Sequence, residues 1–225
     1  MRDHIAHTAV RAGRDPNSVM LVGATKGVDA NRVRAAVAAG LREIGENRIQ
    51  EALPKISALG PGPRWHLIGH LQRNKARPAA EHFEVIHSID GLATAQAVDH
   101  AAGRAGRRIA VLVEVNVAGE AMKYGVPPEA AGALVAAVGA CAHLAPVGLM
   151  TVAPMTDDPE TVRPVFRRLR ELRDRLREEG AGQGFRELSM GMSDDFEVAI
   201  EEGATMVRIG RAIFGDRAGP RPART

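Results

Sequence analysis

LSMGMSDDFEVAIEEGATMVRIGRAIFG, residues 188–215, is the stretch of this sequence that decides the fold. It predicts two short apolar strands with an amphipathic helix between them. A glycine turn follows each strand, at Gly191 and at Gly210. Asp194 and Asp195 come just before the helix, where a helix N-terminus favours negative charge. The stretch therefore predicts the strand–turn–helix units from which parallel sheets are built.

The two glycine turns of this stretch form a candidate phosphate site. Backbone N–H groups at glycine turns can approach an anion closely, and the hydroxyl of Ser193 follows the first turn. In an eight-stranded barrel these turns would be the seventh and eighth loops, where such barrels often bind phosphate. Glycine turns are also common as plain connections, so the motif leaves a purely structural role open.

Strand and helix alternate through the rest of the chain, with short connections. This α/β pattern requires parallel strands with crossover helices, in an open doubly wound sheet or a closed barrel. Strands of similar length, and the lack of a GxGxxG motif after the first one, favour a single (β/α)8 TIM-type barrel. The predicted strands are residues 19–25, 42–45, 65–69, 85–89, 109–117, 146–152, 188–190 and 205–209. The longest is predicted at 109–117, and a long helix at 160–179.

Composition excludes several classes of protein. The 225 residues are 45% hydrophobic with a formal charge of only +3, which indicates a globular domain. Aromatic residues make up 3%, and no basic stripe is visible, so we expect no nucleic-acid partner. The apolar runs are too short to span a bilayer, so we expect no membrane partner and a cytoplasmic protein. No His, Asp and Glu cluster has metal-ligand spacing, and the single cysteine excludes an internal disulfide.

Lys26 is the charged residue that stands at the end of the first apolar strand. Strand ends carry the reactive groups of such barrels, and alternation puts Lys26 on the same side as Val22 and Ala24. Burial there would lower the pKa of the amine and favour the neutral, nucleophilic form that a Schiff base requires. The alternative is a lysine that extends from the strand end into solvent.

Arg208 is the second charged residue in an otherwise apolar strand. It could bind phosphate or face a pyridine nitrogen. The alternative is a structural ion pair across the rim, with Glu43 or Glu114 as its partner. His66 and His70 flank the third strand, where a hydrogen-bonded core histidine is more common than a ligand.

Six segments resemble, in order, the pyridoxal phosphate homeostasis protein family. They are LVGATKG, IGENRIQE, WHLIGHLQRNK, VEVNVAGEAMKYG, VGLMTV and the stretch quoted first. The match as a whole extends over nearly the whole chain, from residue 19 to residue 215. The resemblance implies a single barrel of the alanine racemase N-terminal-domain type. It also implies that pyridoxal phosphate is bound as a Schiff base to the lysine after the first strand.

The resemblance assigns roles to individual residues of this sequence. By motif position the lysine is Lys26, Asn47 lines the ring pocket, and Arg208 faces the pyridine nitrogen. Ser193 and the turn after Arg208, with Gly210 and Arg211, would hold the phosphate. The family often has a second lysine shortly after the first, which is missing from Thr25-Lys26-Gly27-Val28-Asp29. Lys123 matches a lysine that is common in the family, and we consider it as a second amine or as a solvated loop residue.

Function is expected to be control of the free cofactor level, as a carrier or buffer that can supply apo-enzymes dependent on pyridoxal phosphate. We expect a monomer with little or no turnover and no catalytic residues. A racemase-like enzyme is the alternative, although alanine racemase adds a catalytic tyrosine from a second domain and Tyr124 is the only tyrosine here. A third possibility is non-covalent binding of another phosphorylated metabolite. Residues 1–217 should form the barrel and residues 218–225 a disordered tail.

Overall fold

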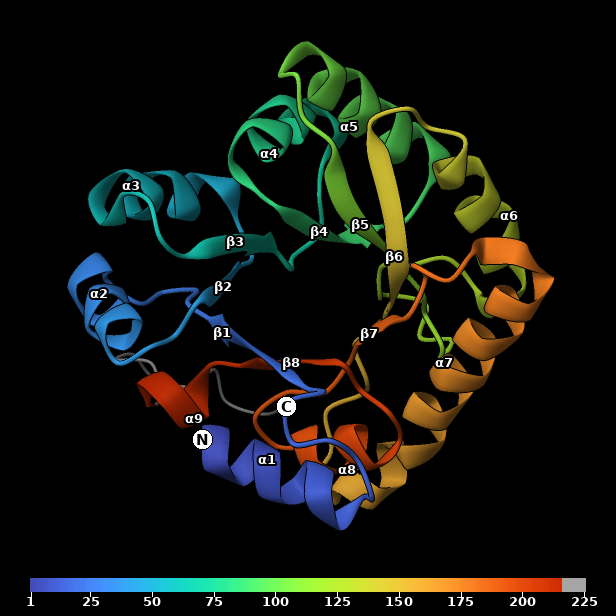
Figure 1. The fold of residues 1–225 in the computed structure, drawn as a ribbon. Coiled ribbons are helices and arrows are strands. Elements are labelled where there is room, and N and C mark those ends of the chain that lie inside the picture. The colour runs from blue at the N-terminus through green and yellow to red at the C-terminus, as the bar shows by residue number, and fades with distance from the viewer. Residues whose placement is uncertain (216–225) are drawn as a thin grey trace.

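The computed structural model describes residues 1–215, which form a closed barrel of eight parallel strands in the order β1 to β8. Each strand pairs with the next in sequence, and β8 pairs with β1 to close the ring (Figure 1). The predicted (β/α)8 barrel is confirmed. The strands are β1 (Met20–Ala24), β2 (Glu43–Glu46), β3 (Arg64–Leu67), β4 (Val85–Ile89), β5 (Ile109–Glu114), β6 (Leu144–Met150), β7 (Glu187–Ser189) and β8 (Met206–Ile209).

Helices surround the ring of strands, one after each strand and α1 before the first (Figure 1). Within the described residues they are α1 (Arg2–Arg11), α2 (Ala30–Ala38), α3 (Ile49–Leu59), α4 (Ala76–His82), α5 (Leu92–Arg104), α6 (Pro128–Gly139), α7 (Arg163–Leu176), α8 (Phe196–Glu201) and α9 (Arg211–Phe214). Short 3-10 helices at Arg73–Lys75 and Pro159–Val162 lead into α4 and α7.

Most predicted strands agree with the structure to within one or two residues at each end, and two predicted elements differ by more. The fifth strand ends at Glu114 rather than at residue 117, and β6, with 7 residues, is the longest strand. Beyond β5 the chain keeps only a single bridge from Val115 to Val126 before it enters its loop. The long helix predicted at 160–179 is regular only over α7, because a π-helical turn with Gly180 at a φ of 106° follows it. Residues 216–225, which include the predicted tail, lie outside the described part of the chain.

The apolar core has two parts, as the period-two alternation of barrel strands requires. A large cluster, which includes Phe83 and Phe166, fills the space between the strands and the helices. A much smaller cluster of Val85, Leu112 and Met150 lies apart from it. These three residues come from β4, β5 and β6 and face the barrel interior, so the apolar packing of that interior is limited.

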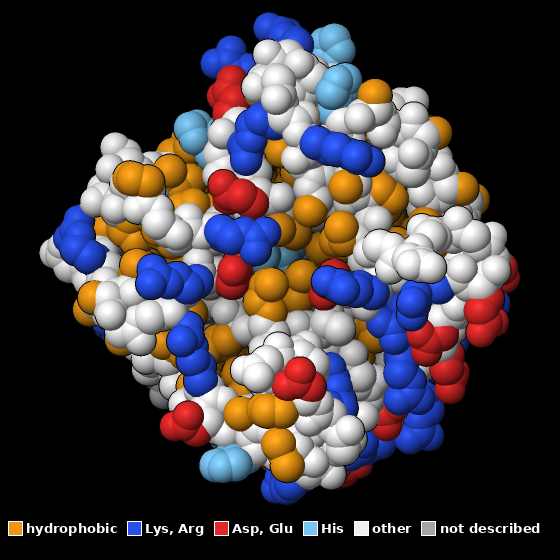
Figure 2. Space-filling view, viewed as in Figure 1, with side chains coloured by type: hydrophobic (Ala, Val, Ile, Leu, Met, Phe, Trp, Pro, Cys, Tyr) orange, Lys and Arg blue, Asp and Glu red, His pale blue; other side chains and the backbone are white. Residues whose placement is uncertain are grey.

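The outer surface carries many paired charges. Arg163, Arg167 and Arg170 of α7 all contact the carboxylate of Glu202, at 3.2, 3.0 and 3.2 Å. Figure 2 shows basic and acidic side chains interspersed on one face of the barrel, including the rim along α7. Among the helices of residues 1–215, none is long and apolar enough to cross a membrane. The same residues contain no group of three or more His, Cys, Asp or Glu side chains suited to holding a metal ion.

Candidate functional site

Barrel closure brings the ends of β7, β8, β1 and β2 to one side of the rim. The register pairs Val22 with Arg208 between β1 and β8, and Ala24 with Gly45 between β1 and β2. Lys26 follows β1 by two residues and Asn47 follows β2 at once, so the continued register puts them at the same height. The predicted site residues therefore come from neighbouring strand ends, as in other barrels.

Lys26 is exposed, so its predicted burial is wrong. The reason is that β1 ends at Ala24, and the chain turns outward through Lys26 and Gly27, where φ is 71°. The exposed position corresponds to the alternative of a lysine that extends from the strand end. The side chain of Lys26 is therefore exposed to solvent rather than enclosed in the barrel interior.

A buried ion pair holds the backbone just before Lys26. Nζ of Lys55 donates to the Thr25 carbonyl oxygen at 2.7 Å and to Oε1 of Glu46 at 2.5 Å. The hydroxyl of Thr25 donates to the same carboxylate oxygen at 2.5 Å. Because Glu46 ends β2 and Lys55 belongs to α3, these bonds connect the ends of β1 and β2 and fix the start of the turn that carries Lys26. Sequence reasoning did not identify this pair.

The turn after β7 packs closely against strand β8 and helix α8. The N–H of Arg208 donates to the Gly191 carbonyl at 3.0 Å. Gly191 has a φ of 92°, and a Cβ there would lie 2.6 Å from Cβ of Ala199, so only glycine is accommodated. Ser193 is half-buried in this turn. The predicted helix start is also observed, because Asp195 is the N-cap of α8, although its Oδ1 accepts the N–H of Met192 rather than a helix N–H.

The turn after β8 lies against the end of β1. A Cβ at Gly210 would lie 3.1 Å from the Ala24 carbonyl oxygen, so this turn is within reach of the strand that leads to Lys26. Gly210 is the N-cap of α9, and the first N–H groups of a helix have no partner inside it. Arg211 is exposed and forms an ion pair with Asp194 of the neighbouring turn. The predicted phosphate residues are thus brought together.

Arg208 is a fully enclosed cation in the barrel interior, with an exposed fraction of 5%. Its Nη1 donates to Oγ of Ser189 at 2.6 Å and its Nη2 donates to the Thr151 carbonyl at 2.8 Å. Burial lowers the pKa of Arg208 to about 10, against the opposing charges of Asp195 and Glu114, so it stays charged at neutral pH. No ion pair within residues 1–215 joins it to Glu43 or Glu114, so the predicted alternative of a rim pair is wrong.

Glu114 ends β5 and is the second buried ionisable group near Arg208. Burial, together with the charge of Asp90, raises the pKa of Glu114 to about 7, and Arg208 opposes this rise. Its Oε2 has no hydrogen-bond partner within residues 1–215. Glu114 therefore adds a carboxyl group near the positive charge of Arg208.

A row of hydrogen bonds crosses the barrel interior from Arg208 to the first residue of β2. From Ser189 it continues to Nδ1 of His87 at 2.8 Å, then from Nε2 of His87 to Nδ1 of His66 at 2.8 Å. Nε2 of His66 then lies 2.7 Å from Oε2 of Glu43. We name these five residues (Glu43, His66, His87, Ser189 and Arg208) the interior network. Arg208 and Glu43 are thus connected, but through three other side chains.

Charges within the interior network are set by burial and by the partners. Burial, together with the positive charge of Arg208, keeps the pKa of His87 well below its usual range, so His87 is neutral. Burial would raise the pKa of Glu43, but the hydrogen bond of His66 and the charge of Arg64 act against it and the pKa is lowered. Glu43 is therefore ionised at neutral pH.

Sequence reasoning missed two members of the interior network and the hydrogen bonds that join all five. It identified His66 as a hydrogen-bonded core residue, which is confirmed, but gave no role to His87 or Ser189. The available signal was that a polar residue interrupts each of three apolar strands, WHLIG, VIHSI and ELS. His70 is not a core residue, because it lies outside β3, forms an ion pair with Asp90 and stacks on Tyr124 at 3.8 Å.

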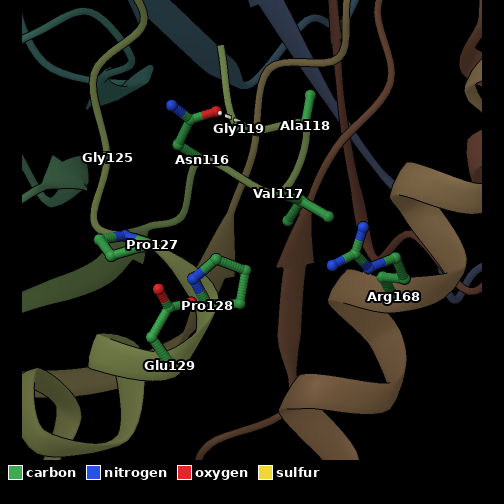
Figure 3. Close-up of a pocket in the computed structure, with 9 residues that line it drawn as sticks. All are labelled: Asn116, Val117, Ala118, Gly119, Gly125, Pro127, Pro128, Glu129 and Arg168. Atoms are coloured by element: carbon green, nitrogen blue, oxygen red, sulfur yellow. Dashed lines mark hydrogen bonds between the residues drawn. The ribbon is translucent and has the colours of Figure 1, made fainter. Parts of the chain in front are cut away.

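A cavity of about 410 Å³ lies beside the loop between β5 and α6 (Figure 3). Arg168 projects from α7 toward it, and Asn116 holds the loop by accepting the Gly119 N–H at 3.1 Å. Lys123 of the same loop pairs with Glu120 at 2.5 Å, so its role as a second amine stays a prediction. None of the six predicted cofactor residues lines this cavity.

A second cavity of about 270 Å³ borders Ser193, but its chemistry does not suit an anion. Five carboxylates line it, those of Glu160, Asp194, Asp195, Glu197 and Glu201. Negative side chains in that number repel phosphate. A phosphate near Ser193 would therefore lie on the other side of the turn, toward Gly210 and Arg211.

Known proteins are similar in sequence to this chain along nearly its whole length. The family model for the N-terminal domain of alanine racemase matches residues 1–218. The pyridoxal phosphate homeostasis protein of Pseudomonas aeruginosa is 46% identical over 220 residues, which cover 97% of this chain and 94% of that protein. The protein of the same name from Aquifex aeolicus is 44% identical over 216 residues, which cover 96% and 94%.

Solved structures share the fold. PipY of Synechococcus elongatus, solved with pyridoxal phosphate bound, is 36% identical and matches with a TM-score of 0.82 over 94% of this chain and 100% of that chain. Alanine racemase of Clostridium difficile, at 16% identity and a TM-score of 0.72, shares the fold alone. By its sequence and its barrel, the chain belongs to the pyridoxal phosphate homeostasis protein family, with a fold of the alanine racemase N-terminal-domain type.

Proposed function

We propose that this protein binds pyridoxal 5′-phosphate through Lys26 and buffers or carries it inside the cell. The observation that carries the proposal is the buried, charged guanidinium of Arg208 below the turns that bear Ser193 and Gly210. Burial of a cation costs free energy, so a buried arginine indicates a structural or binding role. A ring nitrogen that accepts a hydrogen bond is such a reason, and PipY was solved with this cofactor bound.

The residues around the rim fit the parts of the cofactor. Phosphate needs several donors, and the Ser193 hydroxyl, the first N–H groups of α9 and the Arg211 guanidinium supply them on one side of the turn. The interior holds Arg208, which can only donate hydrogen bonds and so suits an unprotonated ring nitrogen. Asn47, at the end of β2, would line the ring.

The aldehyde of pyridoxal phosphate supplies the group that bonds reversibly to a primary amine. In the proposed bond, Nζ of Lys26 condenses with the aldehyde carbon and one water molecule is released. The exposure of Lys26 lets a free aldehyde reach it, and the same exposure lets water or another amine reverse the bond. Reversibility suits a buffer, and transfer to apo-enzymes would use the same accessible position.

The covalent assignment is tested with borohydride, which reduces the imine and fixes a pyridoxyl group on the protein. We expect a yellow complex whose reduced form carries the label on the peptide with Lys26. Lys26→Arg keeps the charge but not a nucleophilic amine, and it should abolish both the absorbance and the label. A label found mainly on Lys123 or Lys75 would contradict the assignment. A colourless complex that still binds would favour non-covalent capture of a phosphorylated metabolite.

A further inference from the structure

We propose that the interior network positions the guanidinium of Arg208 for the ring of the cofactor, and that Glu43, at the other end of the row, fixes the direction of every hydrogen bond in it. The inference rests on the proposed function for its last step, the contact of Arg208 with the ring. The order of the hydrogen bonds themselves is a property of the protein alone.

The direction of the row follows from its two ends. Glu43 is ionised and can only accept, so Nε2 of His66 carries a proton. In the proposed order Nδ1 of His66 accepts, which requires a proton on Nε2 of His87. Because His87 is neutral, its Nδ1 then accepts, and the hydroxyl of Ser189 donates to it. All bonds therefore run toward the carboxylate.

The order of the hydrogen bonds reaches Arg208 through its contact with Ser189. Because the single hydroxyl proton of Ser189 is engaged with His87, its oxygen faces Arg208 with lone pairs only, and it accepts from Nη1 at 2.6 Å. The Thr151 carbonyl accepts from Nη2 at 2.8 Å. Two acceptors on two of its nitrogens define the plane of the guanidinium. The remaining N–H groups are then held in one direction.

The free-energy cost of burying these polar side chains indicates that the interior network has a functional role. His66, His87 and Ser189 are each fully enclosed, and barrel interiors are commonly filled by branched apolar residues. Polar groups without water are tolerated when each has its partner, and such networks select one side-chain arrangement. A rim ion pair alone would not need three polar side chains across the barrel.

The hydrogen-bond order is tested first on the protein without added cofactor. Nitrogen-15 NMR of the imidazole rings distinguishes the two neutral tautomers from the cation. We expect His66 and His87 both to be neutral, with the proton on Nε2, near neutral pH. A cationic His66, or a proton on Nδ1 of either ring, would reverse part of the row and overturn the proposal, whatever the protein binds.

Positioning is tested by the absorption spectrum and affinity of the complex with pyridoxal phosphate. Ser189→Ala removes the acceptor, so we expect a displaced absorption maximum and affinity lower by about tenfold or more. Ser189→Thr keeps the hydroxyl and should restore the spectrum. Ser88→Ala is the matched control, because Ser88 is a fully buried strand serine that donates to the Gly69 carbonyl at 2.7 Å and does not touch the network.

The far end of the row provides the sharper test. Glu43→Gln keeps an acceptor for His66 but adds a donor, so the proton order is no longer enforced. We expect it to change the ring tautomers and to displace the absorption maximum through the three residues between Glu43 and Arg208 in the row. Glu84→Gln is its control, since Glu84 accepts the Trp65 N–H at 2.7 Å and pairs with Arg107 at 3.7 Å but is not part of the interior network.

The outcomes separate the two proposals. Wild-type spectra for both Ser189→Ala and Glu43→Gln would overturn the positioning role while leaving the proposed function intact. Failure of the wild-type protein to bind pyridoxal phosphate would remove the proposed function and with it the contact of Arg208 with the ring. The tautomer measurement would still decide whether the order of the hydrogen bonds holds.

Discussion

Ser193 and Arg211 would contribute different interactions to a phosphate at the rim of the barrel. Ser193 is half-buried and its turn faces acidic side chains on one side, whereas Arg211 contributes positive charge on the other. Arg211 is already paired with Asp194. A phosphate would therefore compete with Asp194 for Arg211, while the Ser193 hydroxyl can donate directly.

Ser193→Ala should weaken binding of pyridoxal phosphate by roughly 1.5–3 kcal/mol, because it removes one charge-assisted hydrogen bond to phosphate. Titration by absorbance or calorimetry measures the effect. Pyridoxal without phosphate should bind much more weakly to the wild type and should not distinguish the wild type from Ser193→Ala. If pyridoxal and pyridoxal phosphate bound the wild type equally well, the phosphate site would be refuted.

At the scale of elements, α7 and α8 are joined by one carboxylate. Glu202, the C-cap of α8, has an exposed fraction of 5% and receives arginines from three successive turns of α7. Burial raises its pKa, but the hydrogen bonds of Arg167 and Arg163 outweigh this and lower it. Since α8 carries the Ser193 turn at its start, this contact holds the helix behind the candidate phosphate site.

Glu202→Gln should lower the free energy of unfolding near neutral pH by about 1–3 kcal/mol, because arginines lose a charged acceptor. The pKa of Glu202 is lower in the folded state, so its stabilisation is complete above the unfolded pKa of about 4.3 and is lost as pH falls through the folded pKa. Urea unfolding of the wild type and of Glu202→Gln, near neutral pH and again in acid, measures the difference in unfolding free energy.

The difference between wild type and Glu202→Gln should therefore shrink in acid. Glu178→Gln, which changes an exposed carboxylate just after α7, is the control and should have little effect at either pH. A gap that stays constant down to the lowest pH at which the protein folds would contradict the assigned role of the ionised carboxylate.

For the whole molecule, the barrel offers a cofactor one well-equipped side. Lys26, Ser193, Gly210 and Arg208 all belong to the β1, β7 and β8 side of the ring. Across the mouth, Tyr124 stacks on His70 with the ring planes 8° apart. Capture of the cofactor needs only the first group, whereas racemisation needs proton transfer on both faces of a substrate.

We therefore expect little or no racemisation of amino acids. Arg208 stays charged at neutral pH, so it would leave the ring nitrogen unprotonated and weaken the electron sink. Tyr124 is the only tyrosine of the sequence, and its ring is engaged with His70. Single enantiomers incubated with the loaded protein and analysed by chiral chromatography should keep their configuration. Turnover of about 1 per second or faster, abolished by Lys26→Ala, would instead identify an enzyme.

The barrel and the members of its rim could be predicted from the sequence. Strand–helix alternation with short connections permits few topologies, and residues at strand ends must meet at one rim in a parallel barrel. Lys26, Asn47, Ser193 and Gly210 are predictable on that ground, because each follows a strand directly or by a few residues. Local sequence patterns are sufficient for this, because periodicity predicts the type of each element and turn residues predict where it ends.

Only the tertiary structure decided which polar side chains touch inside the ring. His87 and Ser189 are 102 positions apart and meet because β4 and β7 face each other across a closed barrel. Likewise, the exposure of Lys26 depended on where β1 stops pairing with β2 and β8. Period-two alternation predicts the side on which a residue lies, but hydrogen bonds depend on distances of a few ångströms between strands, which ring closure and register set.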